Sequence, residues 1–198
     1  MFNKVTSSKI ISVFKGSVFF AAALLLNVGN GWAAGSDDHS HGDQMMKIVG
    51  QPGSTSDVSR TIEVSLEDNY FEPEEIAVMP GETIRFILKN NGEFVHEFNI
   101  GTPDMHAAHQ EEMVMMFEHG VLELDKINHD MMEMDMGNGQ MMKHDDPNSK
   151  LLEPGETAEI IWTFAEDGNL EFACNIPGHY DAGMAGMFEF SDKVALGE

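Results

Sequence analysis

Hydrophobic and polar residues alternate along two separate stretches of the chain. In residues 61–66 the apolar side chains of Ile62, Val64 and Leu66 share one face, and polar side chains share the other. Similar short runs occupy residues 84–88, 94–100, 159–164, 170–174 and 187–190. Alternation of this length, rich in β-branched and aromatic residues, is typical of half-buried β-strands. We therefore expect a mostly β chain.

Turn residues separate the runs of the first stretch at short intervals. Pro80-Gly81 and Asn90-Asn91-Gly92 are the clearest of these turn signals. Many short strands with regular turns indicate a β-sandwich or a barrel. The two β-rich blocks, residues 61–101 and 151–192, are together long enough for one compact sandwich.

An insertion, residues 102–150, lies between the two blocks and holds 10 of the 16 methionines and 5 of the 9 histidines. Its first part carries helix signals, with Thr102 as N-cap, Pro103 at the first helical position and Gly120 as the stop. One face of this helix is expected to pack on the sandwich through Met105, Ala108, Met113, Met116 and Phe117. The second part, residues 131–144, has no clean period, and so long a loop inside a compact domain is usually functional or disordered.

The N-terminal residues have the layout of an export signal. Three lysines, Lys4, Lys9 and Lys15, come before an apolar stretch, residues 17–28. Small residues follow this stretch. This stretch is shorter than the roughly 20 residues that span a bilayer. We therefore predict a cleavable signal peptide, residues 1–33, and no membrane span in the mature chain.

The next segment, residues 34–60, is polar and rich in glycine and is predicted to be a flexible leader. It contains His39 and His41 beside carboxylates, a pair that either binds a divalent metal weakly or is only solvated. The sequence leaves both alternatives open. The folded domain is expected to occupy residues 61–198, with the insertion at 102–150.

Composition and charge narrow the function. The chain has 34 acidic and 11 basic residues, which gives a formal charge of −23. Such a charge repels phosphate, so nucleic acids and anionic membrane surfaces are excluded as partners and cations are favoured. Core packing does not explain the many methionines that lie among Asp, Glu and His. Thioether and imidazole ligands favour copper over calcium or magnesium, so copper is the expected cofactor.

A set of metal-ligand residues lies in the second β-rich block. Cys174, His179 and Met184 follow a Cys-x4-His-x4-Met spacing, in a loop that Pro177 and Gly178 shape between two predicted strands. A loop at one end of a sandwich can aim all three side chains at one point. A fourth ligand then has to come from another strand.

That fourth ligand is predicted to be His96, because it is the other histidine within the β-rich blocks. Two His and one Cys in a trigonal arrangement, with a weak and distant axial Met, form a type 1 (blue) copper site. A lone Cys is commonly a buried small residue, but in an exported protein an unpaired Cys favours a bound metal. Met187 is a competing axial ligand. It belongs to the return strand, where packing is its expected role, so Met184 is preferred.

Several motifs resemble those of the cupredoxin family of blue copper proteins. They are Phe71-x-Pro73, residues 80–86, His96-Glu97-Phe98, residues 153–157, and the loop from Cys174 to Met184 with Gly186 after it. The resemblance covers most of residues 61–192 and implies an all-β, cupredoxin-like Greek-key β-sandwich with a Met/His-rich, partly helical insertion. It further implies that His96, Cys174, His179 and Met184 ligate one type 1 copper. Glu97 is a departure, because many electron-carrying cupredoxins have an asparagine there that braces the ligand loop.

Within the family, residues 58–64 and the insertion resemble periplasmic cupredoxins associated with bacterial copper resistance. The resemblance implies a periplasmic protein that is involved in copper tolerance. Such a protein binds copper and either buffers it or passes it on to a redox or copper-export partner. The insertion, whose thioethers suit Cu(I), is expected to be a low-affinity collector or an additional Cu(I) site. The alternative function is a soluble electron carrier for a redox enzyme. Catalysis is not expected, because the β-rich blocks offer only two histidines.

Overall fold

The computed structural model describes residues 48–132, 144–165 and 168–191. The predicted signal peptide, residues 1–33, and the pair His39 and His41 lie outside the described residues, as does part of the insertion, residues 133–143. The expectations for those segments therefore stay predictions.

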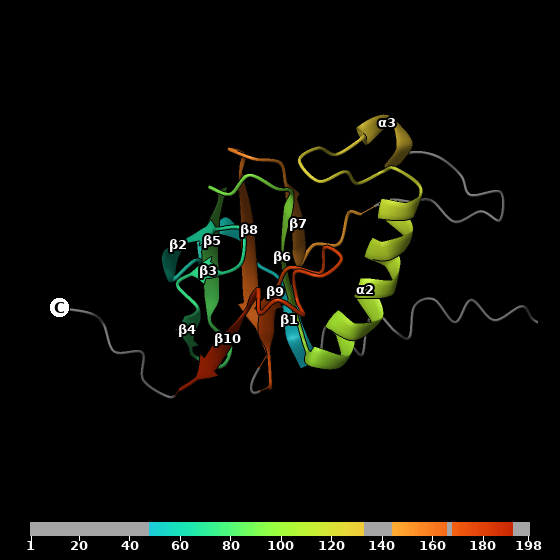
Figure 1. The fold of residues 1–198 in the computed structure, drawn as a ribbon. Helices are drawn as coiled ribbons and strands as arrows, with labels where there is room; N and C mark the ends of the chain where they lie inside the picture. The colour runs from blue at the N-terminus through green and yellow to red at the C-terminus, as the bar shows by residue number, and fades with distance from the viewer. Residues whose placement is uncertain (1–47, 133–143, 166–167, 192–198) are drawn as a thin grey trace, which may run out of the picture. The chain divides into compact units, whose positions relative to one another are not determined.

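In the described residues, two five-stranded sheets pack as a β-sandwich, whose layers Figure 1 shows. Their strand orders are β1–β8–β5–β2–β3 and β4–β10–β9–β6–β7. The strands are β1 (Gly50–Pro52), β2 (Arg60–Leu66), β3 (Phe71–Glu72), β4 (Glu75–Val78), β5 (Thr83–Asn90), β6 (His96–Gly101), β7 (Ser149–Leu152), β8 (Thr157–Phe164), β9 (Glu171–Ala173) and β10 (Ala185–Phe190). The pairs β2–β5 and β4–β10 are parallel, and the other pairs are antiparallel. The predicted all-β, cupredoxin-like sandwich is confirmed.

An aromatic core lies between the sheets. Phe98 of β6 contacts Phe71 of β3 and Phe86 of β5, with ring centroids 5.9 and 5.6 Å apart. The predicted alternation in β2 places Val64 and Leu66 in the same core. Burying one such side chain contributes about 1.5–3 kcal/mol. The core therefore holds the strands rigidly, and with them the loops that carry the candidate ligands.

The sandwich begins before residue 61. β1 pairs with β8, and Nε1 of Trp162 donates a hydrogen bond to the carbonyl of Val49 at 3.0 Å. A short 3-10 helix, η1 (Thr55–Asp57), lies between β1 and β2. These residues fall within the range 34–60 that the sequence assigns to a flexible leader. Their polar, glycine-rich composition contains no alternation that would reveal an edge strand.

The insertion begins with the predicted helix, α2 (Pro103–Glu118). The hydroxyl of Thr102 accepts the N–H of Met105 at 3.3 Å, as expected of an N-cap. Gly120 follows the helix with a φ of 72°, a conformation that glycine adopts without strain. A second helix, α3 (His129–Met132), lies later in the insertion.

The buried face of α2 differs from the predicted one. His106, Met113 and Met116 are buried, whereas Ala108 and Phe117 are exposed. The prediction for these last two residues is wrong because it assumed an apolar surface beneath the helix. The strand that α2 covers instead presents polar groups, so histidines turn toward it.

β6 is buried on both of its faces. Phe98 points into the core, so Glu97 and Asn99 point to the opposite side of the strand, because side chains alternate along a strand. All of these residues are nevertheless buried. The helix α2 lies beside this outer face (Figure 1), where Nε2 of His109 is 2.9 Å from Oε1 of Glu97. The insertion therefore creates a second buried environment, outside the hydrophobic core, in which polar side chains meet.

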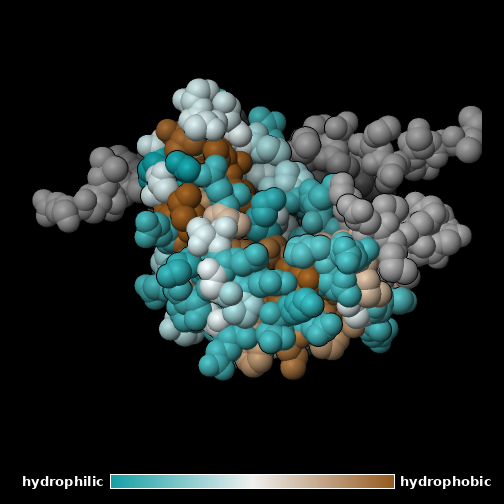
Figure 2. Space-filling model, turned by 90° about the horizontal axis from the view of Figure 1, so that it is seen from above, coloured by the Kyte–Doolittle hydropathy of each residue, from teal (hydrophilic) through white to brown (hydrophobic). Residues whose placement is uncertain are grey.

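The surface is largely hydrophilic where Figure 2 displays it, and the hydrophobic residues there form a few clusters. None of the helices in the part of the chain that the structure describes is both long enough and apolar enough to span a lipid bilayer.

Candidate metal centre

The Cys-x4-His-x4-Met loop joins β9 to β10. The N–H of Cys174 donates to the carbonyl of Met184 at 3.1 Å, and the N–H of Met184 donates to the carbonyl of His179 at 3.0 Å. Gly178 and Gly183 have φ values of 88° and 101°, which side chains other than glycine rarely adopt. The loop is closed on itself by these bonds, so the three predicted ligands are held in one compact turn at the ends of two strands.

Three of the four predicted ligands converge. The Sγ of Cys174 lies 3.4 Å from Nδ1 of His179 and 3.9 Å from Nδ1 of His96. One ligand atom from each of the three residues lies within 4.8 Å of the other two. Cys174 and His96 are buried, whereas His179 is half-buried. His96 comes from β6 and the other two from the loop, as the sequence analysis expected.

The separations fit a single metal ion. Metal–nitrogen bonds of about 2.0–2.1 Å and a metal–sulfur bond of about 2.3 Å place the two donor atoms about 3.3–3.8 Å apart when the angle is about 100–120°. The two S···N distances, 3.4 and 3.9 Å, agree with this range to within 0.1 Å. One thiolate and two imidazoles are the strong ligands of a type 1 copper site. The donor set therefore fits the cofactor that the sequence predicts.

Asp68 orients the ring of His96. Its Oδ1 accepts a hydrogen bond from Nε2 of His96 at 3.2 Å, which leaves the lone pair of Nδ1 directed toward Cys174. The same oxygen accepts the N–H of Glu93 at 2.7 Å. A Cβ at Gly92 would lie 2.3 Å from this oxygen and 2.7 Å from Nε2 of His96. Close approach of the loop to the ring therefore requires glycine.

Asp68 and Gly92 contact the candidate site but are not among the residues predicted from the sequence. The Asn-Asn-Gly turn signal identifies the turn at Gly92, but no pattern in the sequence places Asp68 beside His96, 28 positions later.

Burial sets the protonation states of the three converging ligands. It lowers the pKa of His179 to about 4, and it also lowers the pKa of His96 despite the opposing effect of Asp68. Burial raises the pKa of the Cys174 thiol to about 12. At neutral pH both imidazoles therefore offer lone pairs, whereas the thiol keeps its proton until a metal displaces it.

The two candidate axial residues lie in different environments. Met184 is fully buried immediately before β10, and its backbone pairs with that of Cys174. Its role as a ligand stays a prediction. Met187 lies within β10 and is 51% exposed. The packing role expected for Met187 is therefore not observed.

Glu97 supports the ligand loop in spite of the departure from the family pattern. Its Oε2 accepts hydrogen bonds from the backbone N–H and from Nδ2 of Asn175, at 3.1 and 2.9 Å. Its own backbone N–H donates to Sγ of Cys174 at 3.3 Å. The carboxylate thus takes the bracing role that the resemblance assigns to an asparagine in many electron-carrying cupredoxins.

The other carboxylate oxygen of Glu97 belongs to a second cluster, which the sequence analysis does not predict. Oε1 lies 2.9 Å from Nε2 of His109, 2.7 Å from Nε2 of His144 and 2.6 Å from Oγ of Ser149. The sequence placed both histidines in the insertion without giving either a partner. The one available signal was an acidic residue inside a predicted strand, since a carboxylate that is buried there needs partners.

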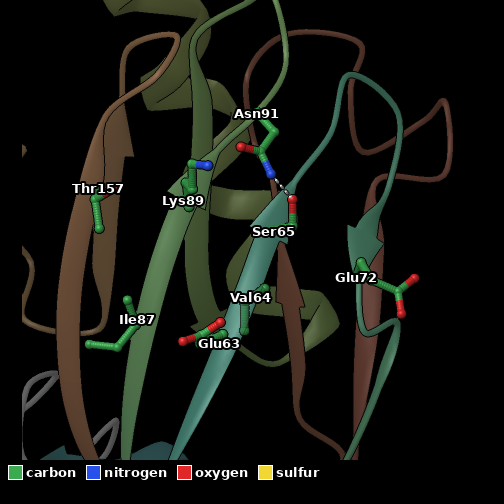
Figure 3. Close-up of a pocket in the computed structure, with 8 residues that line it drawn as sticks. All are labelled: Glu63, Val64, Ser65, Glu72, Ile87, Lys89, Asn91 and Thr157. Atoms are coloured by element: carbon green, nitrogen blue, oxygen red, sulfur yellow. Dashed lines mark hydrogen bonds between the residues drawn. The ribbon is translucent and has the colours of Figure 1, made fainter.

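A surface groove lies on the outer side of the sheet that contains β2 and β5 (Figure 3). Its lining side chains come from β2, β3, β5, β8 and the turn after β5, and they include Glu63, Ile87 and Lys89. None of the predicted ligands lines this groove.

Comparisons with known proteins agree with this geometry. The model of the family described as "copper binding proteins, plastocyanin/azurin family" matches residues 58–190. The chain is 48% identical over 147 residues to the "copper-resistant cuproprotein CopI" of Pseudomonas aeruginosa. The alignment covers 71% of this chain and 81% of the relative. It is 36% identical over 138 residues to the protein of the same name from Rubrivivax gelatinosus, covering 69% of this chain and 70% of the relative.

Among solved structures, auracyanin B is similar, with a TM-score of 0.51 and 17% sequence identity. The alignment covers 73% of this chain and 96% of that one. At this identity the similarity concerns the fold alone.

Proposed function

This chain belongs to the plastocyanin/azurin family of copper-binding proteins, and from that premise we propose that it is a periplasmic type 1 copper protein of copper tolerance. In this role it binds copper and either buffers it or passes it on. The proposed ligands are His96, Cys174, His179 and Met184, with Met184 as the weak axial ligand.

The convergence of one thiol and two imidazoles carries this proposal. The three donors come from two separate parts of the sandwich and meet in a buried position at separations that fit one metal ion. Copper in such a site changes between Cu(I) and Cu(II). The chain contributes a rigid arrangement. His96 lies in β6, the other ligands lie in the loop between β9 and β10, and Asp68 and Glu97 form hydrogen bonds to His96 and to Cys174.

The tolerance role rests on the likeness to the two relatives. Both are named copper-resistant cuproproteins, and the identity of 48% to one of them extends over most of both chains. The formal charge of −23 supports a protein that attracts metal cations.

An electron carrier for a redox enzyme is the second candidate. The half-buried ring of His179 favours it, because this ligand brings one edge of the site to the surface, where electrons can reach a partner. Both candidates use the same copper site, so only a functional measurement distinguishes them.

Location and partners follow from the same proposal. The predicted signal peptide, residues 1–33, would deliver the protein to the periplasm. There its partners would be copper ions and a redox or copper-export protein. Binding rather than catalysis is proposed, since the ligand set describes one mononuclear site.

Absorption spectroscopy of the copper-loaded protein, with metal counting, tests the site. We expect an intense visible thiolate-to-copper band that Cys174→Ser abolishes. Met184→Leu should shift the band, whereas the matched control Met187→Leu should leave it unchanged, because Met187 is exposed. A folded protein that stays colourless with cupric salt would overturn the assignment.

Growth of a deletion strain tests the role. Loss of the gene should lower the copper concentration at which growth stops, and the wild-type chain but not Cys174→Ser should restore it. A deletion strain that tolerates copper normally but respires slowly would favour the electron carrier instead.

A further inference from the structure

We propose that Glu97, His109 and His144 form a second metal site, separate from the Cys174 centre and suited to Cu(II). The three residues come from β6, from α2 and from the segment just before β7. The site lies on the outer face of β6, opposite to His96. It does not depend on the proposed function of the Cys174 centre, because the two sites have no ligand in common.

The distances among the three donor atoms fit one ion. Oε1 of Glu97 lies 2.9 Å from Nε2 of His109 and 2.7 Å from Nε2 of His144, and the two nitrogens are 3.2 Å apart. Bonds of about 2.0–2.1 Å at angles of about 85–105° place donor atoms about 2.7–3.3 Å apart. All three observed distances agree with that range to within 0.1 Å. One ion can therefore contact all three atoms without rearrangement of the side chains.

The surroundings of His109 match those of a metal ligand. Its Nδ1 lies 3.0 Å from Oε2 of Glu112, at hydrogen-bond distance. A carboxylate that accepts the proton of one ring nitrogen leaves the lone pair of the other nitrogen for a metal, and ligating histidines usually have such a partner. Here the other nitrogen is Nε2, the one that faces Glu97 and His144.

The cluster is buried, so the fold holds its three side chains together, in contrast to charged groups that meet by chance on a surface. The side chains of Glu97, His109 and His144 are 0%, 12% and 3% exposed. Ser149 donates its hydroxyl hydrogen to Oε1 of Glu97 at 2.6 Å, and Asn175 holds the other oxygen at 2.9 Å. The carboxylate is therefore fixed in orientation, as a ligand should be.

The donor set selects the ion. Two imidazoles and one carboxylate lack the sulfur that favours Cu(I), and they are too few and too rich in nitrogen for calcium or magnesium. Among divalent first-row ions, Cu(II) binds nitrogen and oxygen sites most tightly. In a chain of a copper-binding family, Cu(II) is therefore the expected occupant.

The rival interpretation is a network of hydrogen bonds without metal. In that case Oε1 of Glu97 accepts hydrogen bonds from two imidazoles and a hydroxyl at once, and both Nε2 atoms carry a proton although they are only 3.2 Å apart. A metal ion replaces these crowded protons with three bonds. The two interpretations differ in one measurable property, which is the binding of Cu(II) without Cys174.

Copper binding to the Cys174→Ser variant of the exported chain tests the proposal. His179, His39 and His41 are replaced by Ala in the same background, so that neither the imidazole pair of the Cys174 centre nor the leader can contribute. With cupric ion as the probe, we expect one Cu(II) per chain, with an electron paramagnetic resonance signal and no visible thiolate band. His109→Ala with His144→Ala should reduce this count to none. His109→Gln alone should weaken Cu(II) binding by more than about 100-fold. Loss of a residue that only hydrogen-bonds to a ligand weakens binding by about 10- to 100-fold, and His109 is proposed to be a ligand itself.

The matched control is His119→Ala with His129→Ala, which removes two exposed histidines from the same insertion. It should leave the count at one. To show that the fold survives, His109→Ala with His144→Ala is also made in the chain that retains Cys174, where the thiolate band should persist. No Cu(II) bound to the Cys174→Ser chain, or an equal loss in the control, would overturn the second site. Displacement of its Cu(II) by an equal concentration of zinc would overturn the choice of ion.

Discussion

The backbone N–H of Glu97 donates a hydrogen bond to the Sγ of Cys174 at 3.3 Å. The residue before it, His96, points to the same sulfur from one side of β6, while the carboxylate of Glu97 lies on the other side. An N–H aimed at sulfur stabilises the thiolate once a metal has displaced the proton. Two consecutive residues of one strand therefore belong to two different clusters, on opposite faces of a sheet.

Asn175→Ala is expected to loosen the ligand loop. The side-chain Nδ2 of Asn175 donates to Oε2 of Glu97 at 2.9 Å, so its removal leaves a buried carboxylate with one partner fewer. The free energy of unfolding should fall by about 1–3 kcal/mol, and the thiolate band should shift without loss of copper. Urea unfolding and absorption spectra measure the two effects. Asn91→Ala, which removes an exposed hydrogen bond to Ser65, should cost no more than about 0.5 kcal/mol.

Asp68→Ala is expected to weaken copper binding at the Cys174 centre by about 10- to 100-fold, because the ring of His96 loses the partner that orients it. Asp68→Asn should recover part of the affinity, since the amide oxygen can still accept the proton of Nε2. Competition with a copper chelator measures the change. Asp57→Ala, on the exposed 3-10 helix, is the control. An unchanged affinity in Asp68→Ala would show that the sheet alone orients His96.

Gly92→Ala is expected to disturb the same contact by steric overlap. The added Cβ would lie 2.3 Å from Oδ1 of Asp68, so the loop or the ring of His96 has to move. We expect a loss of about 1–3 kcal/mol in the free energy of unfolding, together with weaker copper binding. Gly168→Ala, whose Cβ would meet no atom closer than 3.4 Å, is the matched control. If both variants behave like wild type in thermal unfolding and copper titration, the close approach at Gly92 is not required.

The buried carboxylate of Glu82 is expected to make stability depend on pH. Burial raises the pKa of Glu82, but hydrogen bonds from Arg60, from the N–H of Met79 and from Ser59 outweigh burial, and the pKa lies below its usual value of 4.5. A carboxyl group with a lowered folded pKa contributes stability above the unfolded pKa, and that stability is lost as the pH falls through the folded pKa. The free energy of unfolding of the metal-free protein should therefore decline below about pH 4.5.

Glu82→Gln tests this dependence. At pH 7 it should lose about 1.5–3 kcal/mol, because a hydrogen-bonded charge is removed, and its stability should vary less with pH below 4.5. Glu159→Gln, which removes the exposed partner of Arg85, should change stability by less than about 1 kcal/mol. Denaturant unfolding at several pH values gives both results. Parallel pH curves for wild type and Glu82→Gln would contradict the assignment.

The strands and the ligand loop could be predicted because their signals are local. Alternation in β2 and the capping residues of α2 act within a few positions, and the structure agrees with both. The edge strand β1 and the buried face of α2 could not be predicted in the same way. β1 is held by pairing with β8, more than 100 positions away, and the face of α2 depends on the polar strand beneath it.

The sequence by itself determined the fold class and the likeness to a copper-binding family, because period-two patterning and a fixed Cys-x4-His-x4-Met spacing express short-range geometry. Only the tertiary structure decided that Asp68 orients His96 and that Glu97 meets His109 and His144. These partners lie 28, 12 and 47 positions apart along the chain. Contacts across such separations depend on how sheets and helices pack, and packing is a property of the whole folded chain.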